Sequence, residues 1–135
     1  MTGTRTARRL AVLAVFAALV ALTSCKSTGP VDIAGLTPAE VFQRAQAASD
    51  SGDFRRSLAY YEAFLAQPGI PADRAAWARY EAALLYHKLG DDDTALAKLD
   101  ELLARYATDK TLPDGPRVLA ASVKAAILEK RSKKR

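Results

Sequence analysis

The stretch YEAALLYHKLGDDDTALAKL, residues 80–99, determines the expected fold. Its first half continues a pattern of apolar residues at helical spacing that begins near residue 72 and ends near residue 89. Gly90 and Asp91 interrupt that pattern, since glycine ends helices and aspartate caps the next one. A further apolar face then follows, made by Ala95, Leu99, Leu102, Leu103 and Tyr106. The stretch therefore predicts two helices joined by a tight turn.

The same arrangement occurs earlier in the chain. Thr37, Pro38 and Glu40 form a helix start, with a capping threonine, a proline at the first helical position and a glutamate three residues after the cap. This helix is expected to run to about residue 51, where Gly52 and Asp53 provide the second turn. One face of the next helix is made by Phe54, Leu58, Tyr61 and Leu65.

A fifth amphipathic helix is expected within residues 114–131, after a loop that contains prolines. Its apolar face is made by Val118, Leu119, Val123, Ala126 and Ile127. The alternation of apolar and polar residues that marks strands is not found beyond residue 24, so we predict an all-α fold.

Paired helices at a fixed interval indicate a helical repeat, and the residues around both turns resemble the tetratricopeptide repeat (TPR). The matching positions of the first unit are Ala45, Gly52-Asp53-Phe54, Ser57 and Tyr61, and those of the second are Ala82, Ala83, Tyr86, Gly90-Asp91-Asp92, Ala95 and Leu99. The chain departs from the family at Arg44 and Phe64, and its repeat is 38 residues long rather than the usual 34. The resemblance implies a short solenoid of two TPR-like helix pairs with a C-terminal capping helix, over residues 37–131.

The amino terminus resembles a different signature. Three arginines (Arg5, Arg8 and Arg9) precede an unbroken run of thirteen apolar residues, 10–22, which is short for a membrane span and typical of a signal peptide. Leu22, Thr23, Ser24 and Cys25 then match the lipobox of bacterial lipoproteins position by position. The resemblance implies that residues 1–24 are cleaved off and that the Cys25 thiol and the new amino group are acylated. An ordinary secretory signal with an unused thiol is the alternative.

Several acyl chains anchor a protein stably, whereas one does so marginally. Residues 25–36 contain Gly29, Pro30 and Gly35 and few large apolar side chains, so we expect them to form a flexible tether between the lipid and the domain. Lys26 is not the aspartate that retains some lipoproteins in the inner membrane. We therefore expect the protein to lie on the periplasmic side of the outer membrane, or on the outer face of the cell membrane in a bacterium that has only one membrane.

The formal net charge of +5 comes from the two ends of the chain. Three basic residues lie in the expected signal peptide and five in the last six positions, so residues 25–129 contain 12 basic and 15 acidic side chains. This distribution does not favour nucleic-acid binding. The C-terminal tail is basic, and its residues 132–135 follow the expected domain. It is either a solvated helix end or a contact for an anionic envelope polymer or lipid.

The resemblance also implies a concave partner-binding surface on the first helix of each pair. Its expected residues, which would bind an unidentified envelope protein, are Phe42, Trp77, Tyr80, Leu84, His87 and Lys88. The alternative is that Trp77, Tyr80 and Leu84 are covered by the fifth helix or by the first helix pair and belong to the core.

Residues for catalysis or metal binding are not evident. The expected acylation consumes Cys25, which is the only cysteine, and His87 is the only histidine. Asp91, Asp92 and Asp93 lack the spacing of a calcium loop and instead suit a helix start. We therefore expect that the protein is not an enzyme and that it carries no cofactor besides the lipid on Cys25.

Together these features predict a membrane-anchored TPR-like adaptor or scaffold that binds a protein partner in the cell envelope. Two alternatives remain open, a structural spacer in the envelope and a lipoprotein that binds a polyanion through its basic tail.

Overall fold

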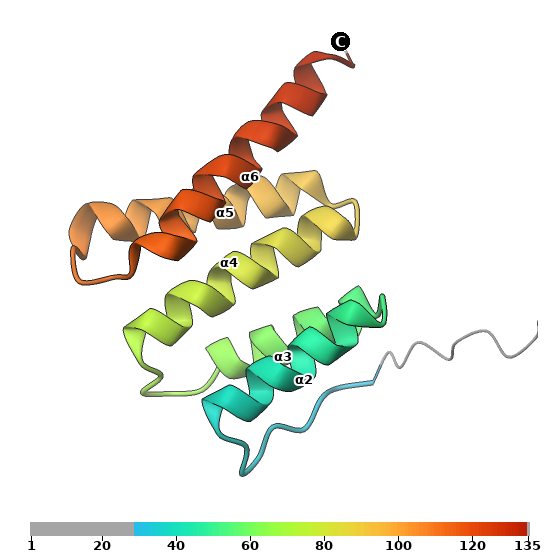
Figure 1. Ribbon diagram of the computed structural model, residues 1–135, viewed down its shortest axis with the longest axis vertical. Helices are drawn as coiled ribbons and strands as arrows, with labels where there is room; N and C mark the ends of the chain where they lie inside the picture. Colours follow the sequence, from blue (N-terminus) through green and yellow to red (C-terminus); the bar gives the residue numbers. More distant parts are fainter. Residues whose placement is uncertain (1–28, 135) are drawn as a thin grey trace, which may run out of the picture.

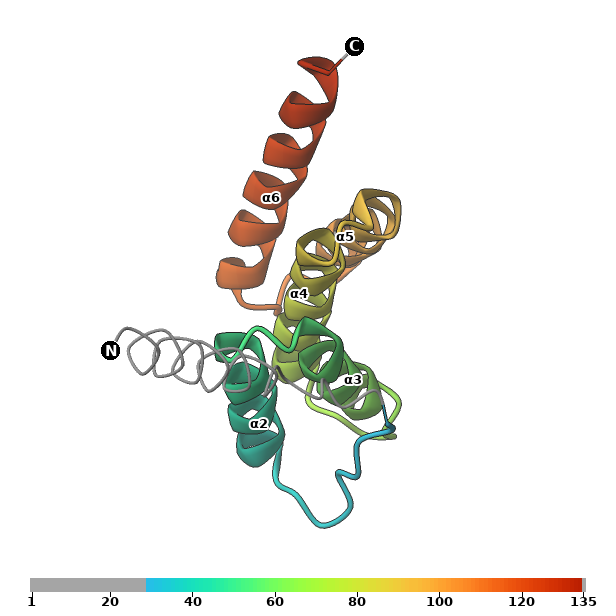
Figure 2. The same ribbon diagram turned by 90° about the vertical axis from the view of Figure 1, so that its right-hand side faces the viewer.

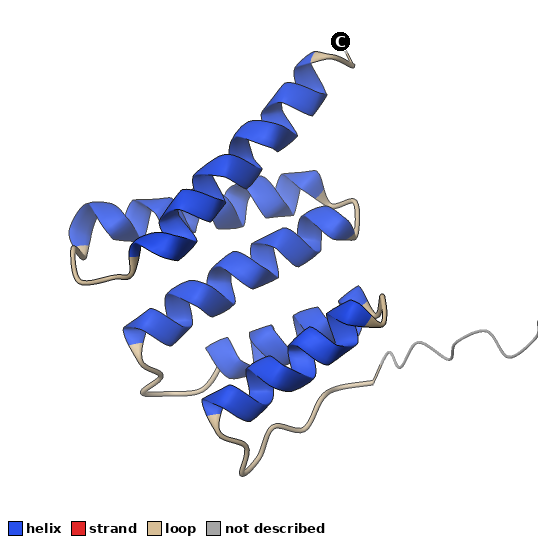
Figure 3. Ribbon diagram, in the orientation of Figure 1, coloured by secondary structure: helices blue, strands red, loops and turns tan. Residues whose placement is uncertain are grey.

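The computed structural model describes residues 29–134, and within this part of the chain every regular element is an α-helix (Figures 1 and 3). The helices are α2 (Pro38–Asp50), α3 (Phe54–Leu65), α4 (Ala72–Lys88), α5 (Asp92–Thr108) and α6 (Asp114–Ser132). The all-α prediction is therefore confirmed. The expected signal peptide and lipobox lie outside the described residues.

The helix starts follow from local hydrogen bonds. The Thr37 hydroxyl accepts a bond from the Glu40 amide, and the Glu40 carboxylate accepts one from the Thr37 amide at 2.8 Å, which completes a capping box. Asp53 and Asp91 cap α3 and α5 in the same way, each accepting a bond from a backbone amide of the first turn.

Glycines make both tight turns possible. Gly52 has a φ of 78° and Gly90 a φ of 87°, in the left-handed region that side chains with a Cβ rarely adopt. The backbone reverses there, so that α2 packs on α3 and α4 packs on α5. The helix α4 also packs on α3, which joins the two pairs (Figure 1).

Two opposite sides of α4 are buried in two different hydrophobic clusters. Ala78, Ala82 and Leu85 belong to the cluster shared with α2 and α3. Ala76, Tyr80 and Ala83 belong to the cluster shared with α5 and α6. Because four of these six side chains are only methyl groups, neighbouring helices can approach α4 closely on both sides.

Part of the expected tether packs on the domain. Ile33 is only 9% exposed, and Val31 and Leu36 pack against the same cluster of α2, α3 and α4. The apolar side chains in this segment are few but large enough to cover the edge of that cluster. Consequently, the part of residues 25–36 that can act as a free spacer is shorter than the composition suggested.

The last helix, α6, packs on α5 and α4, and its C-terminal end projects beyond them (Figure 2). Near its start, Gly115 lies against the Trp77 indole. A Cβ placed on Gly115 would lie 2.7 Å from Cζ2 of that indole, so any side chain at this position would force the Trp77 ring to shift. Two ion pairs join α6 to α5: Lys124 with Asp100 at 2.5 Å, and Arg131 with Asp93 at 2.7 Å. The basic end of α6 is thus partly neutralised by the domain itself.

Gly115→Ala is expected to loosen the contact between α6 and α4. The added methyl group must displace the Trp77 ring, and such overpacking costs about 1–3 kcal/mol, which exceeds the helix propensity that alanine gains at a helix end. Thermal unfolding should shift to lower temperature, and fluorescence of Trp77, the only tryptophan, should shift to longer wavelength.

Gly29→Ala is the matched control, because nothing lies within 4 Å of the Cβ it would add. Equal stability of Gly115→Ala and wild type, with unchanged emission, would contradict the packing of α6 on Trp77.

Candidate functional site

The aromatic residues expected on the concave surface of α4 lie mostly in the core. Tyr80 is buried, and Trp77 and Leu84 pack, half-buried, against the cluster of α5 and α6. The rings of Trp77 and Tyr80 meet edge to face, with their centroids 6.3 Å apart. Of these three side chains Tyr80 is a core residue, whereas Trp77 and Leu84 are partly exposed at the edge of the cluster.

The other expected site residues lie apart from this group. Phe42 packs edge-on against Tyr61 and Phe64, with centroid separations of 5.2 and 5.4 Å, in the cluster of α2 and α3. Lys88 is exposed, and its Nζ lies 5.1 Å from the centre of the Phe54 ring. Phe42 therefore packs in a different hydrophobic cluster from Trp77, Tyr80 and Leu84.

His87 contacts the start of α5. Its Nδ1 lies 2.5 Å from Oδ1 of Asp92, which links the last turn of α4 to the first turn of α5. The hydrogen bond from His87 is the main reason why the pKa of Asp92 is below its ordinary value. The pair closes the Gly90 turn, which is a structural use of the only histidine.

A different surface, which the sequence analysis did not anticipate, runs along α4 between α3 and α5. Three neighbouring hollows have volumes of about 410, 200 and 260 Å³. Glu62 lines both the first and the second, and Arg79 lines both the second and the third. The hollows thus follow one another along α4, and we call the three together the α4 furrow. Its floor includes Arg79, Ala82 and Tyr86 of α4.

Hydrogen bonds and charges hold the middle of the α4 furrow in shape. The Tyr86 hydroxyl donates to Oε1 of Glu62 at 2.6 Å, across from α4 to α3. This bond, together with burial, raises the pKa of Tyr86 to about 12. On the opposite wall, Lys98 lies 5.9 Å from the centre of the Tyr86 ring, and Arg105 donates to Glu101 at 2.8 Å.

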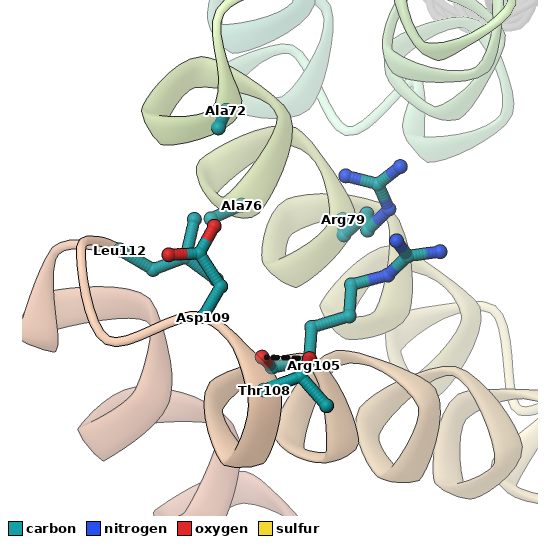
Figure 4. A pocket seen from close by; sticks show the side chains of 7 residues that line it. All are labelled: Ala72, Ala76, Arg79, Arg105, Thr108, Asp109 and Leu112. Carbon is teal, nitrogen blue, oxygen red and sulfur yellow. Dashed lines mark hydrogen bonds between the residues drawn. The ribbon is translucent and has the colours of Figure 1, made fainter.

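Arg79 is a poorly compensated charge of the α4 furrow. It is half-buried, and no carboxylate within residues 29–134 forms an ion pair with it. Burial first, and the nearby Arg105 second, lower the pKa of its guanidinium. Figure 4 shows the Arg79 and Arg105 side chains on one side of the third hollow and Asp109 on the other. This end of the furrow can therefore donate hydrogen bonds to an acidic or carbonyl oxygen of a bound chain.

A second poorly compensated charge, Glu81, lies elsewhere on α4. Its carboxylate is half-buried and forms no ion pair within the described part of the chain. Burial raises its pKa, an effect that Lys88 partly opposes. The Glu81 charge in turn contributes to the raised pKa of Tyr61 and Tyr80, for which burial is the larger cause.

Sequence reasoning missed the α4 furrow for a physical reason. Its lining comes from α3, α4 and α5 at once, and each helix contributes only a few polar residues at ordinary helical spacing. A helical pattern reports which residues share a face of one helix, but not which faces of different helices meet. The sequence signal that could have indicated the furrow is Ala82, a small residue three positions after Arg79 and four before Tyr86, on the same side of α4.

The described residues contain no group of three or more histidine, cysteine, aspartate or glutamate side chains arranged to hold a metal ion. The α4 furrow combines apolar side chains, such as Leu65 and Ala82, with charged ones, which suits reversible binding of a polypeptide segment. None of the described helices is both long and apolar enough to cross a membrane.

Comparisons of the chain with protein-family models, with curated proteins and with solved structures find no match.

The raised pKa of Glu81 predicts how the stability of the fold depends on pH. A carboxyl whose pKa is raised by folding holds its proton more tightly in the folded state, so the folded state loses stability as the pH rises through that pKa. Glu81→Gln cannot ionise, and the variant should therefore be more stable than wild type at pH 7. The difference should narrow below the ordinary glutamate value of 4.5, as measured by thermal unfolding across pH.

Glu129→Gln, at an exposed glutamate of α6, is the control and should not be more stable than wild type at pH 7. If Glu81→Gln proves less stable than wild type at pH 7, the ionised Glu81 contributes favourably to the fold and the argument from burial is wrong.

Proposed function

We propose that this protein is a bacterial lipoprotein, anchored in the envelope through acylated Cys25, whose helical domain is a TPR-like adaptor for a protein partner. The lipobox match at residues 22–25 supports the anchor. Two helix pairs, each joined by a glycine–aspartate turn and followed by α6, support the TPR-like arrangement. The alanines at 45, 82, 83 and 95 are buried where that family places small residues between crossing helices.

The observation that carries the adaptor proposal is the α4 furrow. Its three hollows follow α4, a helix of 17 residues that is about 25 Å long. An extended segment of about seven residues would span that length. Fixed donors and acceptors along the walls, such as Arg79 and Glu62, would select its register.

The α4 furrow lies on the side of α3 and α5, which are the second helices of the two pairs. The resemblance to TPR proteins instead predicted binding on the first helices, α2 and α4. Burial of Tyr80 and the packing of Trp77 against α6 leave little aromatic surface on that side. We therefore propose the α4 furrow as the partner-binding surface in place of the expected concave one.

The proposed anchor would contribute to binding without any contact of its own. A protein held at a membrane meets an envelope partner at a raised effective concentration, so a shallow furrow would suffice for capture. The same anchor would be compatible with the spacer alternative, so the test must examine both the anchor and the furrow.

Photocrosslinking in the native cell tests this proposal. A photoreactive amino acid is placed at Arg55 or Thr108, two exposed residues near opposite ends of the α4 furrow, in chains that carry either Cys25 or Cys25→Ser. With Cys25 present, we expect to find the chain in the membrane fraction and labelled by an alkyne analogue of palmitate. We also expect both crosslinking positions to give an adduct with the same partner protein. Cys25→Ser should abolish the label and reduce the adduct.

Lys88, exposed on another side of α4, and Gln43, exposed on α2, are the control positions. An adduct from Lys88 but not from Arg55 or Thr108 would overturn the furrow and restore the concave surface. No protein adduct from any position, in a membrane-bound and folded chain, would overturn the adaptor and favour the spacer. Palmitate labelling that persists in Cys25→Ser would overturn the anchor.

A further inference from the structure

The first residues that the structure describes are fixed on the domain. Ile33 is buried, and Val31 and Leu36 pack against the same cluster of α2, α3 and α4. The Leu36 amide also donates a hydrogen bond to the Ile33 carbonyl oxygen at 3.1 Å. We call residues 31–36 the docked segment. Because these contacts hold it on the domain, it adds no length to the tether between Cys25 and the domain.

The chain enters the domain at one end of the α4 furrow. Gly29, two residues before the docked segment, lines the first hollow together with Arg55 of α3 and Leu89 of the α4–α5 turn. In Figure 1 the described chain begins on the side of the molecule where the α2–α3 and α4–α5 turns lie. The first hollow is therefore the part of the furrow that lies next to the start of the docked segment.

The distance between the first hollow and the proposed anchor has an upper limit. Gly29 is four residues from Cys25, and four residues span at most about 14 Å, whatever conformation residues 25–28 adopt. The acyl chains proposed for Cys25 lie in the bilayer, which places this residue at the membrane surface. Gly29, and with it the near side of the first hollow, would thus be held within about 14 Å of that surface.

A gap of this size limits what can occupy the first hollow. A folded domain of 100 residues has a radius of gyration of about 13 Å, so it is wider than the gap. A single polypeptide segment, in contrast, can pass between the bilayer and the hollow. The part of a partner protein that stays so close to the bilayer is the stretch that adjoins its own membrane-spanning segment or lipid anchor.

The lining of the first hollow suits a polypeptide better than a lipid headgroup. Its two basic side chains are balanced by two acidic ones, so it has no net charge with which to attract an anionic headgroup. These side chains are Arg55, Arg56, Glu62 and Asp91. Leu89 offers an apolar contact and is 37% exposed. A mixed lining of this kind is typical of surfaces that bind a polypeptide chain.

We propose that the first hollow of the α4 furrow binds the juxtamembrane segment of a protein that is inserted in, or anchored to, the same membrane. This inference rests on the acylation of Cys25 and on the furrow as the partner-binding surface, and it adds where in the partner the bound segment lies. It also gives the docked segment a role, since a shorter tether keeps the first hollow close to the bilayer.

Fluorescence quenching tests the position of the first hollow. The acylated full chain with Arg55→Cys carries a fluorophore on the engineered thiol, since acylation occupies the thiol of Cys25, the only cysteine of the unmodified sequence. This chain is reconstituted in liposomes of phosphatidylcholine and phosphatidylglycerol that contain a lipid with a nitroxide on its headgroup. We expect this lipid to quench the fluorophore strongly.

Ile33→Asp, made in the same labelled chain, should release the docked segment, because it places a charge where the side chain is only 9% exposed. The reach from Cys25 to Thr37 is then about 40 Å, and most of the quenching should be lost. Ala34→Asp is the matched control, since Ala34 is exposed in the same segment, and it should leave the quenching unchanged. Circular dichroism verifies that each chain is folded.

Weak quenching of the labelled Arg55→Cys chain on liposomes would overturn the inference, and so would quenching that Ile33→Asp leaves unchanged. A wild-type chain that stays in solution and keeps a reactive Cys25 thiol would instead overturn the proposed anchor, on which the inference rests.

Mass spectrometry of crosslinked peptides tests the class of the partner. With a photoreactive amino acid at Arg55 in the native cell, the crosslinked residue of the partner should lie within about ten residues of a membrane-spanning segment or a lipidated cysteine, because the gap takes up only about four extended residues. A partner with neither feature would overturn this inference and leave the adaptor proposal intact. No adduct from either Arg55 or Thr108 would overturn both.

Discussion

The structure depends on the burial of α4 on two opposite sides. One side packs on α2 and α3 through Ala78 and Leu85, and another packs on α5 and α6 through Ala76 and Ala83. Because alanine takes so little space, the flanking helices come close enough for one 17-residue helix to serve two hydrophobic clusters. The α4 furrow is a consequence of the same packing, since α3 and α5 both border α4 there and the short Ala82 side chain leaves room between them.

The charges around α4 are arranged less favourably for stability than its apolar side chains are. Arg79 and Glu81 are both half-buried, and neither forms an ion pair within residues 29–134. Burial shifts the pKa of each toward its uncharged form. Ionisable groups kept in such positions are a feature of surfaces that bind other molecules. Ser57 adds a buried hydroxyl without a hydrogen-bond partner among the described residues.

Sequence patterns predicted the helices well because their causes are local. The capping box at Thr37 and the glycine turns at 52 and 90 act within a few residues, and the helices begin and end close to those positions. The site was harder to predict, because exposure depends on neighbours that are distant in sequence. Trp77 could line a groove or a core with the same helical pattern, and the structure leaves it half-buried, with the start of α6 against its ring. The packing of Ile33 and the α4 furrow likewise depend on how separate segments meet.

The central claim is that α4 joins both helix pairs into one cooperative unit, and native-state hydrogen exchange followed by mass spectrometry tests it most directly. If α4 holds the two clusters together, its amides should be the slowest to exchange. Addition of low denaturant should then release α2 with α3 and α5 with α6 in the same transition as α4. Exchange of the α2–α3 pair in a separate, earlier transition, with α4 still protected, would contradict the account.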